Sequence, residues 1–455
     1  FHIFLSHTWA QGEEAMRTVK LMMSELMPDA RVFLDKDDLK TGAGAEYVDV
    51  SNVVLCFCTE KYFQSRACAR EIFRAILRGK PLIAMLEPDA SRGGLTHAAI
   101  EALLTTARYP PHNRPHQPAD QTWAAKWALD GEVQAWGYAA IPTCEQIVAA
   151  LFALPSIEWN RFTAFLQVTM RLTAERLLSE ADRGDALYVQ GEVGNQTLMP
   201  PALTQRRTHH LYCSPHNIGA DRLGAELNEL FRRRSGKDRR GRRSVADAAP
   251  LKVTTSFAEL EQCEHMLVYL TSATWTTAEG SVQYAREVAH AQRLGVHLLL
   301  VHEFPSAVDE PSNARGACDF NDFWNEGWTP KHLLTGEANV YKQIAIALKP
   351  GAWRAAGLAT VALKMGEGGG ERQPIELMEE VEEAGLAAHV PAQLQTQNSG
   401  HPPPRPVCPA WEGNVSDGVR LLQRLRSRGS NRGGPLVGSE RRSHCGDAGG
   451  EDGNE

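Results

Sequence analysis

The chain has 455 residues, 43% of them hydrophobic, and a formal net charge of −7, which is enough for two or three globular domains. No apolar run approaches the ~20 residues of a membrane-spanning helix, and the mild charge predicts solubility rather than a particular partner. The nine cysteines lack metal-type or disulfide-framework spacing, which favours a reducing compartment. Phe1 lies inside an expected strand, with neither a start Met nor a signal peptide before it, so we expect a fragment.

Strands and helices are expected to alternate from the first residue on. Residues 2–6 and 31–34 are predicted strands, and the helix between them places Ala15, Val19, Met22, Met23 and Leu26 on one inner face. A polar, glycine-punctuated segment, 35–44, follows the second strand, and a short helix is expected at 46–50. The carboxyl ends of strands form the ligand-binding edge of an open α/β sheet, so segment 35–44 is a candidate binding or partner-facing loop.

The clearest pattern is a βαβ unit over residues 53–86. Two short apolar runs, 53–58 and 81–86, are predicted as buried strands. The helix between them has one apolar face made of Ala69, Ile72, Phe73, Ile76 and Leu77. Ser65 is the expected N-cap and Gly79 the expected stop signal. Glu71 lies in the second turn, off the apolar face, and is the main candidate functional residue.

After this unit the pattern is less regular. Residues 91–106 predict a helical connection and 109–118 a Pro/His-bearing loop, and we expect 136–153 to supply a last strand and helix. Residues 157–180 predict one helix that packs on a domain as a connector. Segment 191–207 is a predicted linker.

The pattern then returns, which indicates a domain duplication. Residues 209–214, 220–231 and 265–271 match the first strand, the first helix and the central strand, while 281–295 matches the central helix with Glu287 in the place of Glu71. Strands are expected at 252–255 and 296–301, and 318–328, 340–348 and 353–364 close this copy. The second strand has no acidic glycine segment behind it, and Tyr284 stands in place of Cys68.

Two low-complexity features complete the chain. The basic run 231–243 is compatible with nucleic acid, an anionic membrane or an import receptor, but it has no interleaved aromatic residues, and we expect a solvated loop. From residue 365 to 455, Gly, Pro, Arg and Glu dominate, and we expect a disordered tail.

Several motifs in one order resemble a TIR (Toll/interleukin-1 receptor) domain over residues 1–154. They are FLSH at 4–7, VFLDKDDLKTG at 32–42, VVLCFCT at 53–59, and the Ser-x-x-Cys-x-x-Glu of Ser65, Cys68 and Glu71. The resemblance implies a flavodoxin-like five-stranded parallel sheet, a cytoplasmic location and signalling through self-association or other TIR domains. It divides the chain into a TIR domain (1–154), a helical connector and linker (155–207), a degenerate TIR-like domain (208–364) and the tail (365–455).

The resemblance also implies a reaction at Glu71. In enzymatic TIR domains the Glu of this motif cleaves the nicotinamide–ribose bond of NAD⁺, which is a substrate and not a bound cofactor. A fixed carboxylate stabilises or attacks the oxocarbenium-like ribose, and nicotinamide leaves as a neutral group. The alternative is a non-enzymatic adaptor in which Glu71 is an exposed carboxylate paired with Arg74.

Further site residues are implied by the resemblance. Thr8, Trp9, Asp38, Lys40 and Cys68 are expected to border the NAD⁺ site. Ala67 departs from the family, which usually carries an aromatic residue there; Trp9 either supplies the stacking or is a rim residue without a role. His7 and Thr8 face the ligand or cap the first helix, and Cys68 is expected to be buried and inert rather than a nucleophile. Asp35, Asp37 and Asp38 lack the spacing of a calcium loop, His209, His210 and His216 lack partner cysteines at zinc spacing, and Glu287 is expected to be non-catalytic.

Overall fold

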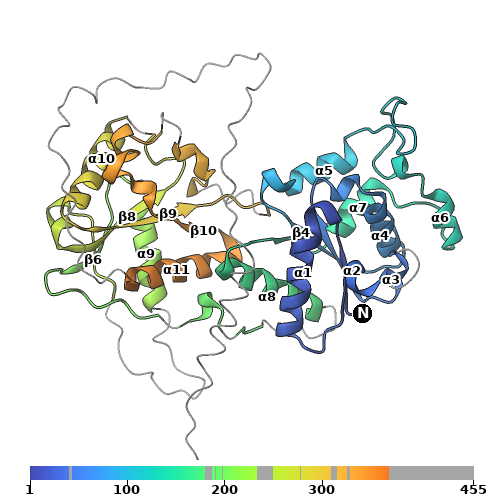
Figure 1. The fold of residues 1–455 in the computed structure, drawn as a ribbon, viewed down its shortest axis with the longest axis horizontal. Helices are drawn as coiled ribbons and strands as arrows, with labels where there is room; N and C mark the ends of the chain where they lie inside the picture. The colour runs from blue at the N-terminus through green and yellow to red at the C-terminus, as the bar shows by residue number, and fades with distance from the viewer. Residues whose placement is uncertain are drawn as a thin grey trace, which may run out of the picture. The chain divides into compact units, whose positions relative to one another are not determined.

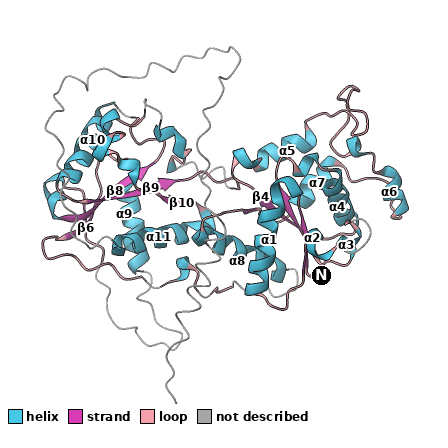
Figure 2. Ribbon diagram, viewed as in Figure 1, coloured by secondary structure: helices cyan, strands magenta, loops and turns pink. Residues whose placement is uncertain are grey.

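Two five-stranded sheets, each built entirely of parallel strands, carry the fold (Figure 1, Figure 2). The α/β class expected from the sequence is therefore confirmed. The computed structural model describes residues 1–39, 44–179, 187–189, 191–196, 198–232, 250–276, 278–308, 315–324 and 328–367. Nearly all of the basic run and of the predicted tail lie outside these residues. Every described residue falls in one compact unit of the chain.

The first sheet has the strand order β2-β1-β3-β4-β5. Its strands are β1 (Ile3–Ser6), β2 (Val32–Phe33), β3 (Val53–Cys58), β4 (Leu82–Leu86) and β5 (Ile157–Glu158). The helices around it are α1 (Trp9–Leu26), α2 (Asp35–Asp38), α3 (Glu46–Asp49), α4 (Arg66–Leu77), α5 (His97–Thr105), α6 (Asp130–Ala135), α7 (Cys144–Leu151) and α8 (Thr163–Ser179).

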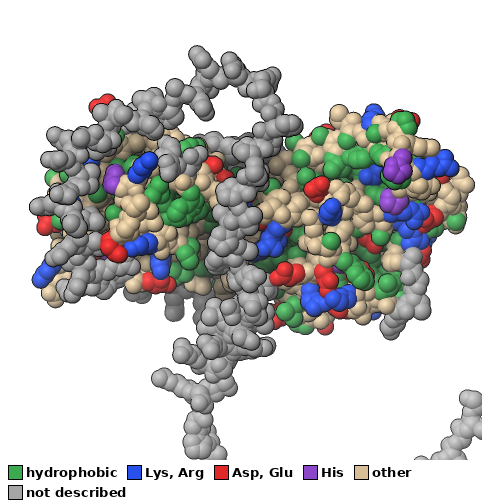
Figure 3. Space-filling view, turned by 45° about the horizontal axis from the view of Figure 1, so that its top comes forward, with side chains coloured by type: hydrophobic (Ala, Val, Ile, Leu, Met, Phe, Trp, Pro, Cys, Tyr) green, Lys and Arg blue, Asp and Glu red, His purple; other side chains and the backbone are tan. Residues whose placement is uncertain are grey.

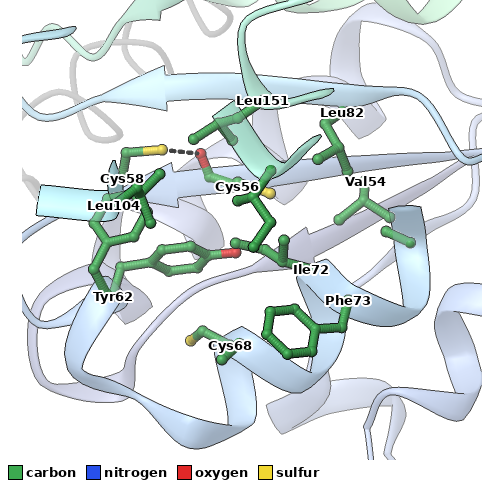
Figure 4. Packing of buried hydrophobic residues seen from close by; sticks show 14 of the residues in the cluster. Val54, Cys56, Cys58, Tyr62, Cys68, Ile72, Phe73, Leu82, Leu104 and Leu151 are labelled. Carbon is green, nitrogen blue, oxygen red and sulfur yellow. Dashed lines mark hydrogen bonds between the residues drawn. The ribbon is translucent and has the colours of Figure 1, made fainter. Parts of the chain in front are cut away.

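Strand β3 is fully buried because its side chains enter two separate cores. Val54, Cys56 and Cys58 pack with α4 and α7, whereas alternate residues pack with α1 and α8 (Val53, Leu55, Phe57). Figure 4 shows the first of these cores, in which Tyr62 and Cys68 belong to the same cluster as Val54, Cys56 and Cys58 of the strand. The continuous apolar run that predicted a buried strand is explained by helices on both faces.

Helix α4 begins and ends where its sequence signals predict. The Ser65 hydroxyl accepts a hydrogen bond from the Cys68 N–H, and Gly79 has φ +62° just after the last turn. The left-handed conformation suits glycine because the Cβ of any other residue would crowd the neighbouring backbone there. Ala69, Ile72 and Phe73 are fully buried, as the apolar face predicts.

Removing the cap gives the first prediction. Ser65→Ala is expected to lower the free energy of unfolding by about 1 kcal/mol, because one N–H at the start of α4 loses its partner. Urea denaturation measures the change. The matched control is Ser24→Ala, whose exposed hydroxyl only donates to the Lys20 carbonyl; this variant is expected to stay within about 0.5 kcal/mol of the parent. Equal losses in both variants would contradict the assigned cap.

The end of the first sheet differs from the prediction. Residues 136–153 supply α7 but no strand, and the fifth strand is β5, which pairs with β4. The helix expected from residue 157 starts only at Thr163. A two-residue strand leaves no periodic signal, so the sequence pattern does not separate Ile157 and Glu158 from the helix that follows. The expected packing of this helix on a core is confirmed, with Phe165, Val168 and Met170 buried.

The second sheet repeats the order of the first. Its order β7-β6-β8-β9-β10 is the same 2-1-3-4-5 arrangement in its own numbering. The strands are β6 (His209–Tyr212), β7 (Val253–Thr254), β8 (Cys263–Leu270), β9 (His297–Glu303) and β10 (Ile346–Leu348), and the long helices are α9 (Ala220–Arg232), α10 (Ala278–Arg293) and α11 (Arg354–Glu367). Phe4 pairs with Val54 as Tyr212 pairs with Met266, so the structural repeat extends to the register. The internal repeat seen in the sequence therefore extends to the topology.

A buried ion pair joins β5 to the segment after β10. Lys349 donates to the Glu158 carboxylate, and both residues are buried. The other Glu158 oxygen accepts the Ser306 hydroxyl at 3.0 Å and the Ala307 N–H at 2.9 Å. Helices α8 and α11 are also in contact, and Trp353 belongs to the same core as α8. We therefore assign this pair a structural role, since removing either partner would leave an uncompensated buried charge.

Candidate functional site

Glu71 lies where α4 passes the carboxyl end of β1. The Ser6 hydroxyl, at the last position of β1, donates to Glu71 Oε2 at 2.6 Å. Tyr62 lies behind Ser6, with 2.7 Å between the two hydroxyl oxygens. Since Ser6 uses its proton toward Glu71, Tyr62 is the donor to Ser6. The three groups form a relay that ends at the carboxyl of Glu71.

The adaptor alternative expects Glu71 to pair with Arg74, and this expectation is wrong. Arg74 instead holds Asp49 through two hydrogen bonds of 2.8 Å, and Arg78 binds the same carboxylate. A two-pronged contact of this geometry is favourable for arginine, and the remaining Arg74 nitrogen, Nη1, lies 3.7 Å from Glu46 rather than near Glu71. Glu71 is partly buried rather than exposed.

The surroundings of Glu71 favour its neutral form. Burial raises the pKa of Glu71 to about 8; the hydrogen bond from Ser6 opposes this shift, and the negative charge of Asp35 adds to it. A large part of Glu71 therefore carries its proton at neutral pH. Burial also raises the pKa of Tyr62, which keeps its hydroxyl a donor. Strongly shifted acids in a partly open position are typical of functional sites, although structural networks produce them too.

A second prediction concerns this relay. Ser6→Ala is expected to raise the pKa of Glu71 above its value in the parent, because the Ser6 hydroxyl stabilises the ionised carboxylate. The pKa is measured by carboxyl-labelled NMR titration. Tyr62→Phe is the matched control, since it removes a hydroxyl that contacts Ser6 and not Glu71, and a smaller change is expected. A pKa that falls in Ser6→Ala would contradict the assignment.

The described start of the acidic segment after β2, Asp35–Asp38, forms a helical turn, α2, in place of the expected loop. Asp35 accepts the indole N–H of Trp9 at 2.6 Å, and His7 Nε2 lies 3.8 Å from the same carboxylate. His7 Nε2 is buried and has no hydrogen-bond partner among the described residues. Trp9 is 64% exposed. An exposed indole held in place by a hydrogen bond offers its face to a ligand or to another protein.

The other predicted site residues have varied surroundings. Asp38 accepts the Leu34 N–H and the Lys20 ammonium, so its carboxylate is used within the fold. Thr8 precedes α1, but its hydroxyl makes no cap and has no hydrogen-bond partner among the described residues. Cys68 is buried and its thiol donates to the His7 carbonyl at 3.4 Å, and burial raises the pKa of this thiol. Lys40 lies outside the described residues.

Ser6, Tyr62 and Gly44 are site residues that the sequence analysis did not select. A Cβ built on Gly44 would lie 3.5 Å from Glu71 Oε1, so this end of the 35–44 segment approaches the carboxyl closely. Ser6 belongs to the FLSH motif, which supplied a signal for it. Tyr62 precedes α4 in a short helical turn, η1 (Tyr62–Gln64), and no sequence pattern connects it to Ser6.

The equivalent carboxylate in the second copy has a different environment. Glu287 is buried, accepts the Tyr212 hydroxyl at 3.0 Å, and lies 3.7 Å from His216 Nε2. Ser214, at the position of Ser6, instead accepts the His216 N–H. The two carboxylates share a place in the fold but not a hydrogen-bonding partner.

No known family model matches the chain, and no curated protein sequence matches it. None of the described helices combines the length and apolar composition that crossing a membrane requires. Charged side chains of both signs lie among apolar ones on the face drawn in Figure 3. Within the described residues, no three His, Cys, Asp or Glu side chains are grouped as metal ligands.

Proposed function

We propose that this chain is a TIR-type signalling protein with two flavodoxin-like units, the first of which cleaves NAD⁺ at the nicotinamide–ribose bond with Glu71 as the catalytic carboxylate. The main support is the hydrogen-bonded, partly buried Glu71 at the carboxyl end of β1. The 2-1-3-4-5 strand order is that of flavodoxin-like folds, and ligands in such sheets bind where β1 and β3 meet. The chain acts in the cytoplasm by associating with itself or with other TIR domains.

The charge of the substrate fits the state of Glu71. The nicotinamide ring of NAD⁺ is cationic, and a cation close to a carboxyl group favours its ionised form. Binding thus favours release of the Glu71 proton to solvent. The resulting carboxylate stabilises or attacks the oxocarbenium-like ribose, while nicotinamide leaves as a neutral molecule. Ser6 keeps the carboxylate in one orientation through its 2.6 Å hydrogen bond. Trp9, fixed by Asp35, provides an exposed ring for stacking in place of the aromatic residue absent at Ala67.

A non-enzymatic adaptor is the second candidate. It is favoured by Trp9, whose exposed ring beside α2 could contact another protein. It is also favoured by Asp38, whose carboxylate binds Lys20 within the fold and so is not directed to a ligand. The two candidates differ in whether NAD⁺ is consumed.

The test is nicotinamide release by the purified chain. NAD⁺ is added to dilute protein and to protein crowded to promote assembly, and nicotinamide is followed by chromatography. The enzymatic proposal predicts release that rises with assembly. If NAD⁺ stays intact under every condition while the protein self-associates, the enzymatic proposal is rejected in favour of the non-enzymatic adaptor.

A further inference from the structure

A hollow of about 240 Å³ lies in the second copy of the fold, away from Glu71. It is lined by the segment after β6 and the first turn of α9, by the end of β8, and by a later segment; the residues that matter below are Ile218, Gly219, Arg222, Arg315 and Gly316. Strands β6 and β8 are neighbours in the sheet, and the chain leaves them in different directions. This is the position at which open parallel sheets take ligands.

The first copy shows why the second one is hollow. Counting on from the paired first strands, Gln11 occupies the place of Gly219. Gly93 corresponds to Gly316, because their carbonyls accept equivalent backbone hydrogen bonds, at 2.8 Å from Glu60 and at 2.7 Å from Ser272. In the first copy the Gln11 amide lies against Gly93 and accepts the Lys61 N–H at 3.2 Å. Gly219 has no side chain to fill this space.

The hollow also has a different charge from its counterpart. Arg222 takes the place of Glu14, and its side chain is 66% exposed, with Glu226 at 3.9 Å. Arg315 donates to the same Glu226, which also binds Arg354 at 2.8 and 3.0 Å. Burial alone would raise the pKa of Glu226, but the hydrogen bonds from Arg315 and Arg354 lower it, so this carboxylate stays ionised and is already shared. Arg222 therefore keeps most of its donor capacity for a ligand.

We propose that this hollow binds a phosphate group carried on a small sugar, held by Arg222 and Arg315. Guanidinium groups suit phosphate because their paired N–H donors match its oxygens. The volume is below the roughly 300 Å³ at which pockets for drug-sized ligands begin, so it fits a pentose phosphate rather than a dinucleotide. Ile218, exposed at the rim, offers an apolar surface to the sugar. The site does not depend on the reaction at Glu71.

Calorimetric titration of the purified chain tests the site with three probes: inorganic phosphate, ribose 5-phosphate and adenosine 5′-monophosphate. Ribose 5-phosphate is expected to bind most tightly. Arg222→Glu, which installs the residue type of the first copy, and Arg315→Gln are each expected to weaken binding by about tenfold or more. Arg286→Glu is the matched control, since it makes the same charge change at an exposed position on α10, and it is expected to bind like the parent.

The outcomes separate the ligand sources and the site. Equal affinity for inorganic phosphate and ribose 5-phosphate would remove the sugar from the proposal and overturn it in that form. Absence of binding by all three probes overturns it entirely. So does parent-like affinity in Arg222→Glu or Arg315→Gln, once circular dichroism shows that the variant is folded. Nicotinamide release is not a readout here, so failure of the NAD⁺ proposal leaves this result interpretable.

Discussion

Lys349→Met is expected to lower the free energy of unfolding by about 3–5 kcal/mol. The substitution removes the ammonium group that neutralises Glu158, whose carboxylate is fully buried. The Ser306 hydroxyl and the Ala307 N–H would still contact Glu158, but they supply no compensating charge. Because β5 and the segment after β10 meet at this pair, the loss is expected in the main unfolding transition of both sheets, as measured by urea denaturation.

Two further variants sharpen this prediction. Lys342→Met is the matched control, because Lys342 pairs with Glu337 on the exposed surface, and a loss below about 1 kcal/mol is expected. Adding Glu158→Gln to Lys349→Met is expected to restore part of the stability, since the amide oxygen can still accept from Ser306 and Ala307 without a charge. Similar losses in Lys349→Met and Lys342→Met would contradict the buried pair.

Glu71→Gln is expected to make the protein more resistant to alkaline destabilisation. The pKa of Glu71 is raised by burial from 4.5 to about 8, so the folded state binds this proton more tightly than the unfolded chain does. Its contribution to stability is fully present below pH 4.5, and it is lost as the pH rises through about 8. Between pH 5 and pH 9 the free energy of unfolding of the parent is therefore expected to fall by a few kcal/mol more than that of the variant. This difference is at most about 5 kcal/mol.

The measurement is urea denaturation at several pH values. Glu25→Gln serves as the matched control, because Glu25 is exposed on α1, and its stability profile is expected to follow the parent. A constant difference between Glu71→Gln and the parent from pH 5 to pH 9 would show that the carboxyl of Glu71 is ionised throughout, and it would remove the argument for a tuned acid.

Elements with strong local signals could be predicted from the sequence. Strand β3 and helix α4 have the predicted bounds because β3 is apolar at every position and α4 has a clear apolar stripe, with a cap at Ser65 and a left-handed glycine at Gly79. The second copy could be predicted because the same periodicities return in the same order, and the second sheet shares the strand order of the first.

The remaining features depend on contacts between distant residues. Strand β5 is two residues long and is defined by its pairing with β4. The Ser6–Tyr62 contact and the choice of Asp49 by Arg74 each join residues more than twenty positions apart, and local propensity carries no information on such pairs. The hollow at Gly219 becomes visible only when register places it opposite Gln11 of the first copy.

Nicotinamide release by matched carboxylate variants tests the central claim most directly. Glu71→Gln and Glu287→Gln make the same change at equivalent positions of the two copies, each keeping an acceptor for the hydroxyl that now contacts it, Ser6 or Tyr212. Glu71→Gln is expected to lower the rate at least about a hundredfold, because a neutral amide cannot stabilise the cationic ribose. Glu287→Gln is expected to retain the parent rate. Full activity in Glu71→Gln would contradict the assignment of the catalytic carboxylate.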